Sequence, residues 1–320
     1  MRADAAERRA VRPTARTIRL LAVAALAATC AAGLVGCAPG TDPGATRESL
    51  TEVTQQPEEP AETDRYDAET HPEPVVEALD CSPVLVVTAR GTGEPSSGQL
   101  LSPVARAIAE ARPDAVETVD LDYPADTEVQ LGGTRGVRTL VDTLDVQAEA
   151  CPEQEFVLLG YSQGALVIGD ALADPAVRLV GAAAGEVDDA AGARIRAIVL
   201  YGDPRFVGTE PYNTGDYDPG LNGLLPRPPG SLDPYAERLR DYCVAGDLVC
   251  QSSLELDEEP HLAYYENGMQ QDGAAFAITR LSPVGSDAGR VGDADAGARA
   301  ADANGGGGAA ADGDAATPAR

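Results

Sequence analysis

Short apolar runs alternate with longer amphipathic stretches over the middle of the chain. The short runs fall at 83–89, 115–121, 155–161 and 195–202, with a last one near 238–244. Each is too short for a typical helix, and Val, Ile and Leu dominate, so each predicts a β-strand. Helix-period apolar positions occur near 99–111, 135–150, 163–173 and 269–281. Continuous apolar strands that alternate with helices indicate a central, mainly parallel sheet covered on both faces, in a three-layer α/β fold.

This pattern is absent on both sides of the middle region. Residues 38 to about 76 combine Pro, Thr and acidic residues with almost no apolar periodicity, and 283–320 are low-complexity Gly, Ala and Asp. Neither composition can bury enough apolar surface to fold. We therefore expect a disordered tether at 37–77, one folded domain at 78–282 and a disordered tail at 283–320.

The N-terminus has the pattern of a targeting segment. Six arginines precede an apolar run that ends in "LVGC" at 34–37. We expect a signal peptide at 1–36, and the final four residues resemble a bacterial lipoprotein signal in which Cys37 is lipidated. The protein would then be exported and anchored to the membrane at the cell surface. A plain secretory signal and a retained membrane helix are the alternatives.

Charge and cysteine content narrow the classes of function. A net charge of −28 argues against nucleic-acid binding, which requires a basic surface. Four cysteines belong to the expected domain, and an exported protein favours two disulfides among them over free thiols. They are Cys81, Cys151, Cys243 and Cys250. No spacing of Cys or His indicates a metal site, so we expect no metal, no cofactor and a monomer.

Ser162 lies in the stretch "EFVLLGYSQGALVIGDAL" at 155–172. It directly follows an apolar strand and precedes a helix, and active groups gather at the carboxyl ends of parallel strands. Glycines at 160 and 164 suit a nucleophile on this turn, because strand and helix pass too closely for a Cβ atom. Ser162 is therefore the candidate nucleophile, with an ordinary hydroxyl in a glycine-rich bend as the alternative.

A serine nucleophile needs a base. The chain has two histidines, and His71 falls in the expected tether, so His261 is the candidate base. Two aspartates compete for the third position. Asp203, in "LYGDPRF", has the features of a turn residue, whereas Asp247 lies between two cysteines where a disulfide would fix its carboxylate. We favour Asp247.

Four blocks of sequence together resemble the cutinase family of α/β-hydrolase esterases, over about residues 79–281. They are "CSPVLVVTARGTGEP", "LLGYSQGAL", "DYCVAGDLVCQSS" and "PHLAYYENG". The resemblance implies a three-layer α/β-hydrolase-like fold with Ser162, His261 and Asp247 as a catalytic triad. It implies an oxyanion hole formed by the backbone N–H groups of Thr92 and Gln163. It also implies two disulfides, which are Cys81–Cys151 and Cys243–Cys250.

The resemblance further implies a serine esterase that forms an acyl-enzyme and acts on short- to medium-chain esters or polyesters. A phospholipase or thioesterase acting on envelope lipids is an alternative, as is a non-catalytic cell-surface binding protein. Two segments leave the substrate open. The Gly- and Pro-rich stretch 208–234 either overhangs the site or runs over the surface, and the acidic run 255–259 is either a solvated face or repels anionic substrates.

Overall fold

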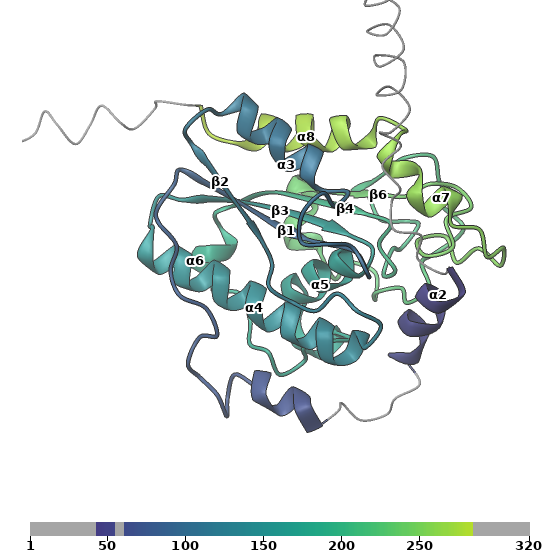
Figure 1. Ribbon diagram of the computed structural model, residues 1–320, viewed down its shortest axis with the longest axis horizontal. Coiled ribbons are helices and arrows are strands. Elements are labelled where there is room, and N and C mark those ends of the chain that lie inside the picture. Colours follow the sequence, from purple (N-terminus) through teal and green to yellow (C-terminus); the bar gives the residue numbers. More distant parts are fainter. Residues whose placement is uncertain (1–42, 55–60, 284–320) are drawn as a thin grey trace, which may run out of the picture. The chain divides into compact units, whose positions relative to one another are not determined.

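A computed structural model describes residues 43–54 and 61–283 (Figure 1). Within these residues, the centre is a six-stranded sheet in the order β2-β1-β3-β4-β6-β5, and every neighbouring pair is parallel. The strands are β1 (Val84–Ala89), β2 (Val116–Asp120), β3 (Glu155–Tyr161), β4 (Ile195–Tyr201), β5 (Asn213–Thr214) and β6 (Leu239–Tyr242). The expected mainly parallel sheet is confirmed.

Helices cover both faces of the sheet, which completes the three layers (Figure 1). One face carries α3 (Ser102–Ala111) and α8 (Met269–Arg280), and the other carries α4 (Val129–Ala150), α5 (Gln163–Leu172) and α6 (Asp189–Gly192). Every residue of β1 and β3 is buried, because these strands lie between the two helical layers. Strand β2 forms one edge and has no fully buried residue.

Each strand and helix expected from the apolar pattern is present, and the largest difference is the start of α4. This helix begins at Val129 rather than at 135. Glycines in its first turns lower helix propensity, so the pattern underestimates its length. Packing explains two of them, because a Cβ at Gly133 would lie 3.0 Å from Val180 and one at Gly136 would lie 3.0 Å from Val167. The glycines let α4 pack closely against its neighbours.

The segment 208–234 is held against the edge of the sheet. It contributes β5, and its backbone bonds to the turn after β4 through Gly223 N–H to Phe206 O (2.9 Å) and Leu225 N–H to Pro204 O (2.8 Å). Leu224 N–H donates to Val249 O (2.9 Å), in the loop that follows β6. A 3₁₀ helix, η3 (Asp233–Arg238), then leads into β6.

The N-terminal residues differ from the expected disordered tether. Helix α2 (Pro43–Glu52) and the 3₁₀ helix η1 (Ala61–Tyr66) are formed, and the following chain runs along α4. Arg138 donates to Glu73 O (3.0 Å), and the Asp142 carboxylate accepts from Val75 N–H (2.8 Å). Polar side chains of α4 hold this backbone, so apolar periodicity could not reveal the contact. Residues 37–42 and the expected tail beyond 283 lie outside the described residues.

Two disulfides join the cysteines in the pairing that the resemblance implies. Cys81 and Cys151 link the residues before β1 to the end of α4, and Cys243 and Cys250 close the loop after β6. Across the described parts of the chain, no helix is both long and apolar enough to cross a bilayer. The expected signal peptide at 1–36 and Cys37 lie outside those parts.

Candidate active site

Ser162 occupies a sharp turn between β3 and α5. Its backbone φ is +52°, a strained value for a residue with a side chain, and its N–H donates to Tyr201 O (2.9 Å). A Cβ at Gly164 would lie 1.8 Å from Ala89 O, and one at Gly160 would lie 2.9 Å from the Cα of Ala165. Both glycines are therefore required for the turn that presents Ser162 at the carboxyl end of β3.

Three segments far apart in sequence bring Ser162, His261 and Asp247 together. His261 lies on the short helix α7 (Glu259–Leu262), and Asp247 lies on the disulfide-closed loop after β6. The Ser162 Oγ is 3.0 Å from His261 Nε2, and His261 Nδ1 is 3.0 Å from each carboxylate oxygen of Asp247. In this arrangement the imidazole can accept the hydroxyl proton while the carboxylate fixes its tautomer.

The Asp247 carboxylate is fully buried and accepts several hydrogen bonds. Tyr264 O–H donates to one oxygen (2.7 Å), and the N–H groups of Val249 (2.7 Å) and Cys250 (3.2 Å) donate to the other. Burial alone would raise the pKa of Asp247, but the charge of His261 and these donors outweigh it, so the pKa lies below its usual range. The carboxylate therefore stays ionised at neutral pH.

Asp203, the competing aspartate, is held by arginine rather than by histidine. It is fully buried; one oxygen accepts from Arg227 Nη1 (2.5 Å) and the other from Arg205 N–H (2.8 Å). Arg205 in turn pairs with Asp170 (2.6 Å). Asp203 thus forms the expected turn and also joins the 208–234 segment to the core, which its local sequence did not indicate.

Two tyrosines position the other residues of the site. Tyr161 donates its O–H to the backbone oxygen of His261 (3.0 Å), and its ring stacks on the imidazole with centroids 5.1 Å apart. Tyr264 bonds to Asp247 as described above. Neither tyrosine was assigned a role in the site from the sequence alone. The only signal was that each lies beside or near a candidate triad residue, in "GYSQG" and "HLAYY".

The residues expected to form the oxyanion hole are in contact: Thr92 lies in the loop after β1, and Gln163 is the first residue of α5. Thr92 donates its hydroxyl to the side-chain oxygen of Gln163 (3.2 Å), and Gln163 donates its amide to Asp126 O (3.2 Å). Among the described residues, neither the Thr92 nor the Gln163 backbone N–H has an acceptor. Both are therefore available to an oxyanion. No cluster of His, Cys, Asp and Glu in the described chain could hold a metal ion.

The layered parallel sheet and the strand-to-helix turn at Ser162 define an α/β-hydrolase fold. The family model for cutinase matches residues 80–281. The chain therefore belongs to the cutinase family, and the matched region is a carboxylic ester hydrolase domain.

Individual relatives agree with this assignment. The chain is 33% identical over 211 residues to a cutinase from Kineococcus radiotolerans, and the match covers 65% of each protein. It is 30% identical over 217 residues to an acetylxylan esterase from Hypocrea jecorina, covering 64% of this chain and 70% of the relative. The catalytic core of the Trichoderma reesei acetyl xylan esterase superposes with a TM-score of 0.55 at 25% identity, covering 63% of this chain and 100% of that one. The match to the bacterial cutinase thus spans slightly less than two thirds of that relative.

Proposed function

We propose that this protein is a serine esterase in which Ser162 is the nucleophile, His261 the general base and Asp247 the residue that orients the base. The observation that carries the proposal is the unbroken series of 3.0 Å contacts from Ser162 Oγ through the imidazole to the Asp247 carboxylate. Ser162 is 2% exposed and His261 is 5% exposed, so little water competes for these hydrogen bonds.

The proposed reaction has two halves. His261 Nε2 takes the hydroxyl proton as Ser162 Oγ attacks the ester carbonyl, and the alcohol then leaves with that proton. In the second half, His261 deprotonates water, which attacks the acyl-enzyme and releases the acid. The backbone N–H groups of Thr92 and Gln163 would bind the oxyanion of each tetrahedral intermediate, and one such donor is worth about 3 kcal/mol.

The proposed substrates are uncharged short- to medium-chain esters. The named relatives are cutinases and acetylxylan esterases, and we extend to this chain only what they share, which is ester hydrolysis. Exposed acidic residues just before His261, in the run 255–259, disfavour anionic phospholipids. Polyesters are included in the proposal, as are esters on other polymers of the cell envelope.

Fluorophosphonate labelling combined with turnover of 4-nitrophenyl esters tests this proposal. The wild-type protein should label and hydrolyse the acetate and butyrate esters, Ser162→Ala should do neither, and Ser96→Ala, an exposed serine, should match wild type. Hydrolysis of phospholipid vesicles without turnover of simple esters would favour the phospholipase alternative. A wild-type protein that neither labels nor turns over any ester would favour the binding-protein alternative.

We also propose the remaining organisation of the chain: a signal peptide at 1–36, a lipidated Cys37, a catalytic domain at 78–282 and a C-terminal tail. The protein would be a monomer that binds no nucleic acid and is exported to the cell surface. Stable retention takes more than one acyl chain. Metabolic labelling with a palmitate analogue should mark wild type and Cys30→Ala but not Cys37→Ala. Absence of label on the wild-type protein would indicate a plain secretory signal without lipidation.

A further inference from the structure

Helix α2 lies beside two segments that flank the proposed catalytic residues. The first flank is the chain from 125 to 131. Ala125 O accepts from Gly93 N–H (2.8 Å), and Asp126 O accepts from the Gln163 amide (3.2 Å). This flank is therefore attached directly to the residues proposed to form the oxyanion hole.

The second flank is the chain that follows Cys250 and leads to His261. Arg47 of α2 donates from Nη1 to the backbone oxygen of Ser253 on this flank (2.6 Å). Cys250 is part of the loop that holds the Asp247 carboxylate. The next residue after Ser253, Leu254, is 87% exposed. Helix α2 thus reaches the side of the site that carries the proposed acid and base.

Helix α2 packs against the first flank through apolar side chains. Leu50 is fully buried, and Leu50 and Val53 belong to the same apolar cluster as Ala125 and Val129. One end of the contact is therefore an apolar patch, and the other includes the hydrogen bond from Arg47 to Ser253. The helix consequently bridges the two flanks. The family match begins only at residue 80, so these contacts are additions to the shared domain.

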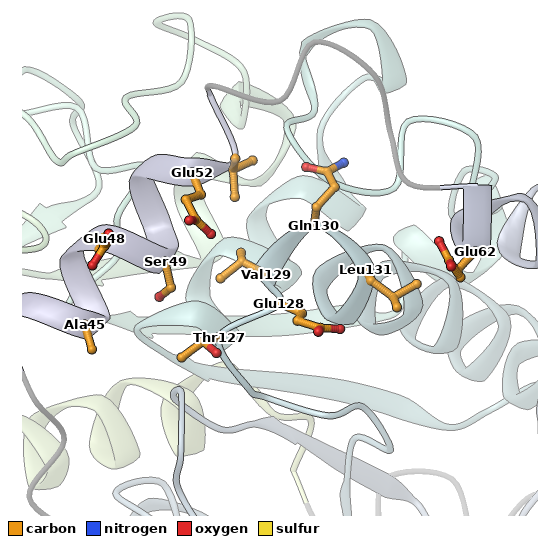
Figure 2. A pocket seen from close by; sticks show the side chains of 11 residues that line it. Ala45, Glu48, Ser49, Glu52, Glu62, Thr127, Glu128, Val129, Gln130 and Leu131 are labelled. Atoms are coloured by element: carbon orange, nitrogen blue, oxygen red, sulfur yellow. The ribbon is translucent and has the colours of Figure 1, made fainter.

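A cavity of about 680 Å³ lies between α2, η1 and the first flank (Figure 2). Figure 2 shows Glu48 and Glu52 on α2 with Glu128 on the facing segment, and Glu62 of η1 also lines the space. Burial of a long alkyl chain requires apolar surface, and a carboxylate product is repelled by these four side chains. The space beside α2 is therefore acidic and does not suit a long acyl chain.

We propose that α2 covers one side of the substrate cleft and confines hydrolysis to small, short-chain esters. The proposal rests on the esterase function proposed above. Displacing α2 would open the space between the two flanks, so that a longer acyl chain could reach from Ser162 to Leu254, an apolar side chain that is already exposed on the second flank. The covered arrangement therefore determines chain-length preference, whereas the proposed triad determines the chemistry.

Substitutions that unseat α2 in the full-length protein test this inference. Leu50→Asp places a charge in the apolar contact between α2 and the first flank, and Arg47→Ala removes the hydrogen bond to Ser253. Thr54→Asp, at an exposed position just after the helix, adds the same charge as the first variant and is its control. If α2 covers the cleft in about nine-tenths of the molecules, only about one-tenth can bind a substrate that requires the open cleft. The apparent kcat/KM for such a substrate is then about tenfold lower than for the open form.

We expect Leu50→Asp to raise kcat/KM for 4-nitrophenyl laurate about tenfold and Arg47→Ala to raise it by less, with the acetate value unchanged for both. Thr54→Asp should match wild type for both esters. Unchanged chain-length profiles in the two unseating variants, with wild-type melting temperatures, would overturn the inference, and so would an equal loss of turnover for both esters. A wild type that does not hydrolyse the acetate ester refutes the esterase function instead.

Discussion

Asp247 and Asp203 are both fully buried, but different partners hold them, and opposite results are expected when each is replaced by asparagine. Asp247→Asn should leave the fold intact and lower turnover by up to ~10⁴-fold, because the neutral amide no longer fixes the imidazole tautomer or stabilises its charged form. Turnover of 4-nitrophenyl acetate, with a melting curve to check folding, measures the effect.

Asp203→Asn is the matched variant and should affect stability instead. It removes one charge from the buried pair with Arg227, which leaves an uncompensated guanidinium and costs about 3–5 kcal/mol. This loss of stability is larger than the loss expected if Asp203 did no more than form a turn. Urea unfolding gives the stability, and turnover per folded molecule should stay near wild type. A greater catalytic loss at Asp203 than at Asp247 would contradict the proposed triad while leaving an esterase possible.

Tyr264→Phe should show how far its hydroxyl supports Asp247. The change removes one of the donors that keep the Asp247 pKa below its usual range, so that pKa should rise. A depressed carboxyl pKa contributes stability at neutral pH that is lost as the pH falls through the folded-state pKa. We therefore expect about 1.5–3 kcal/mol less stability at neutral pH, a smaller difference in acid, and about tenfold lower kcat.

Tyr242→Phe is the control for this effect, since Tyr242 also donates to a carboxylate, that of Asp272 (2.6 Å), outside the proposed triad. Urea unfolding from neutral to acidic pH and a kcat–pH profile should separate the two variants. If both variants lost stability alike and kept wild-type kcat and KM, Tyr264 would have a packing role only.

At the level of elements, the turn between β3 and α5 requires glycine where strand and helix approach each other. Gly164→Ala should destabilise the turn and abolish turnover, because the new methyl group would lie 1.8 Å from Ala89 O. Gly132→Ala in α4 is the control. A Cβ at Gly132 would lie 3.5 Å from its nearest neighbour, Asp126 Oδ1, so alanine fits and should raise the free energy of unfolding by about 0.5–1 kcal/mol. Melting temperatures and turnover of both variants test this. A stable, active Gly164→Ala protein would contradict the close approach of strand and helix.

The same elements show what the sequence could predict. Apolar runs predicted β1 to β4 and β6, and the signal is continuous in β1 and β3, which are buried on both faces. The turn at Ser162 was predictable because a strand and a helix that pass this closely leave no room for a Cβ atom, and glycines at 160 and 164 reveal that constraint in the local sequence. The two-residue strand β5 carries no such signal. Helix α2 was missed since its pattern is weak and Leu50 is the only large apolar side chain within it.

The unpredicted parts of the site depend on contacts between distant residues. Arg227 lies 24 positions after Asp203, and nothing in either local sequence indicates the pair. The bonds of Tyr161 to His261 and of α4 to the chain at 73–79 are likewise long-range. Side-chain to backbone bonds of this kind follow no periodic pattern, so only the folded arrangement reveals them.

For the whole molecule, the two disulfides should contribute differently to stability and to activity. Closing the 70-residue separation between Cys81 and Cys151 stabilises the fold by about 4 kcal/mol, and closing the seven-residue separation between Cys243 and Cys250 stabilises it by about 2.5 kcal/mol. The shorter loop holds Asp247, so its loss should reduce turnover more.

Paired serine substitutions of each disulfide, assayed for melting temperature and for turnover well below melting, separate these effects. The Cys81–Cys151 variant should melt lower and keep near-normal turnover. The melting temperature of the Cys243–Cys250 variant should fall by less than that of the Cys81–Cys151 variant, but its turnover should be slower. Equal turnover in the two variants would mean that the short loop keeps its shape without the bridge.

The Cys81–Cys151 bridge also determines how the domain responds to mechanical load. Cys81 lies three residues before β1, which is paired on both sides within the sheet. A pull on the N-terminal chain would first strip the contacts of α2 and then the hydrogen bonds that residues 73–79 make with α4. The load would then pass through the covalent bridge to the end of α4 instead of peeling β1 from its neighbours. Strand β1, which pairs with the strand that leads to Ser162, is thereby shielded from shear applied at the N-terminal end.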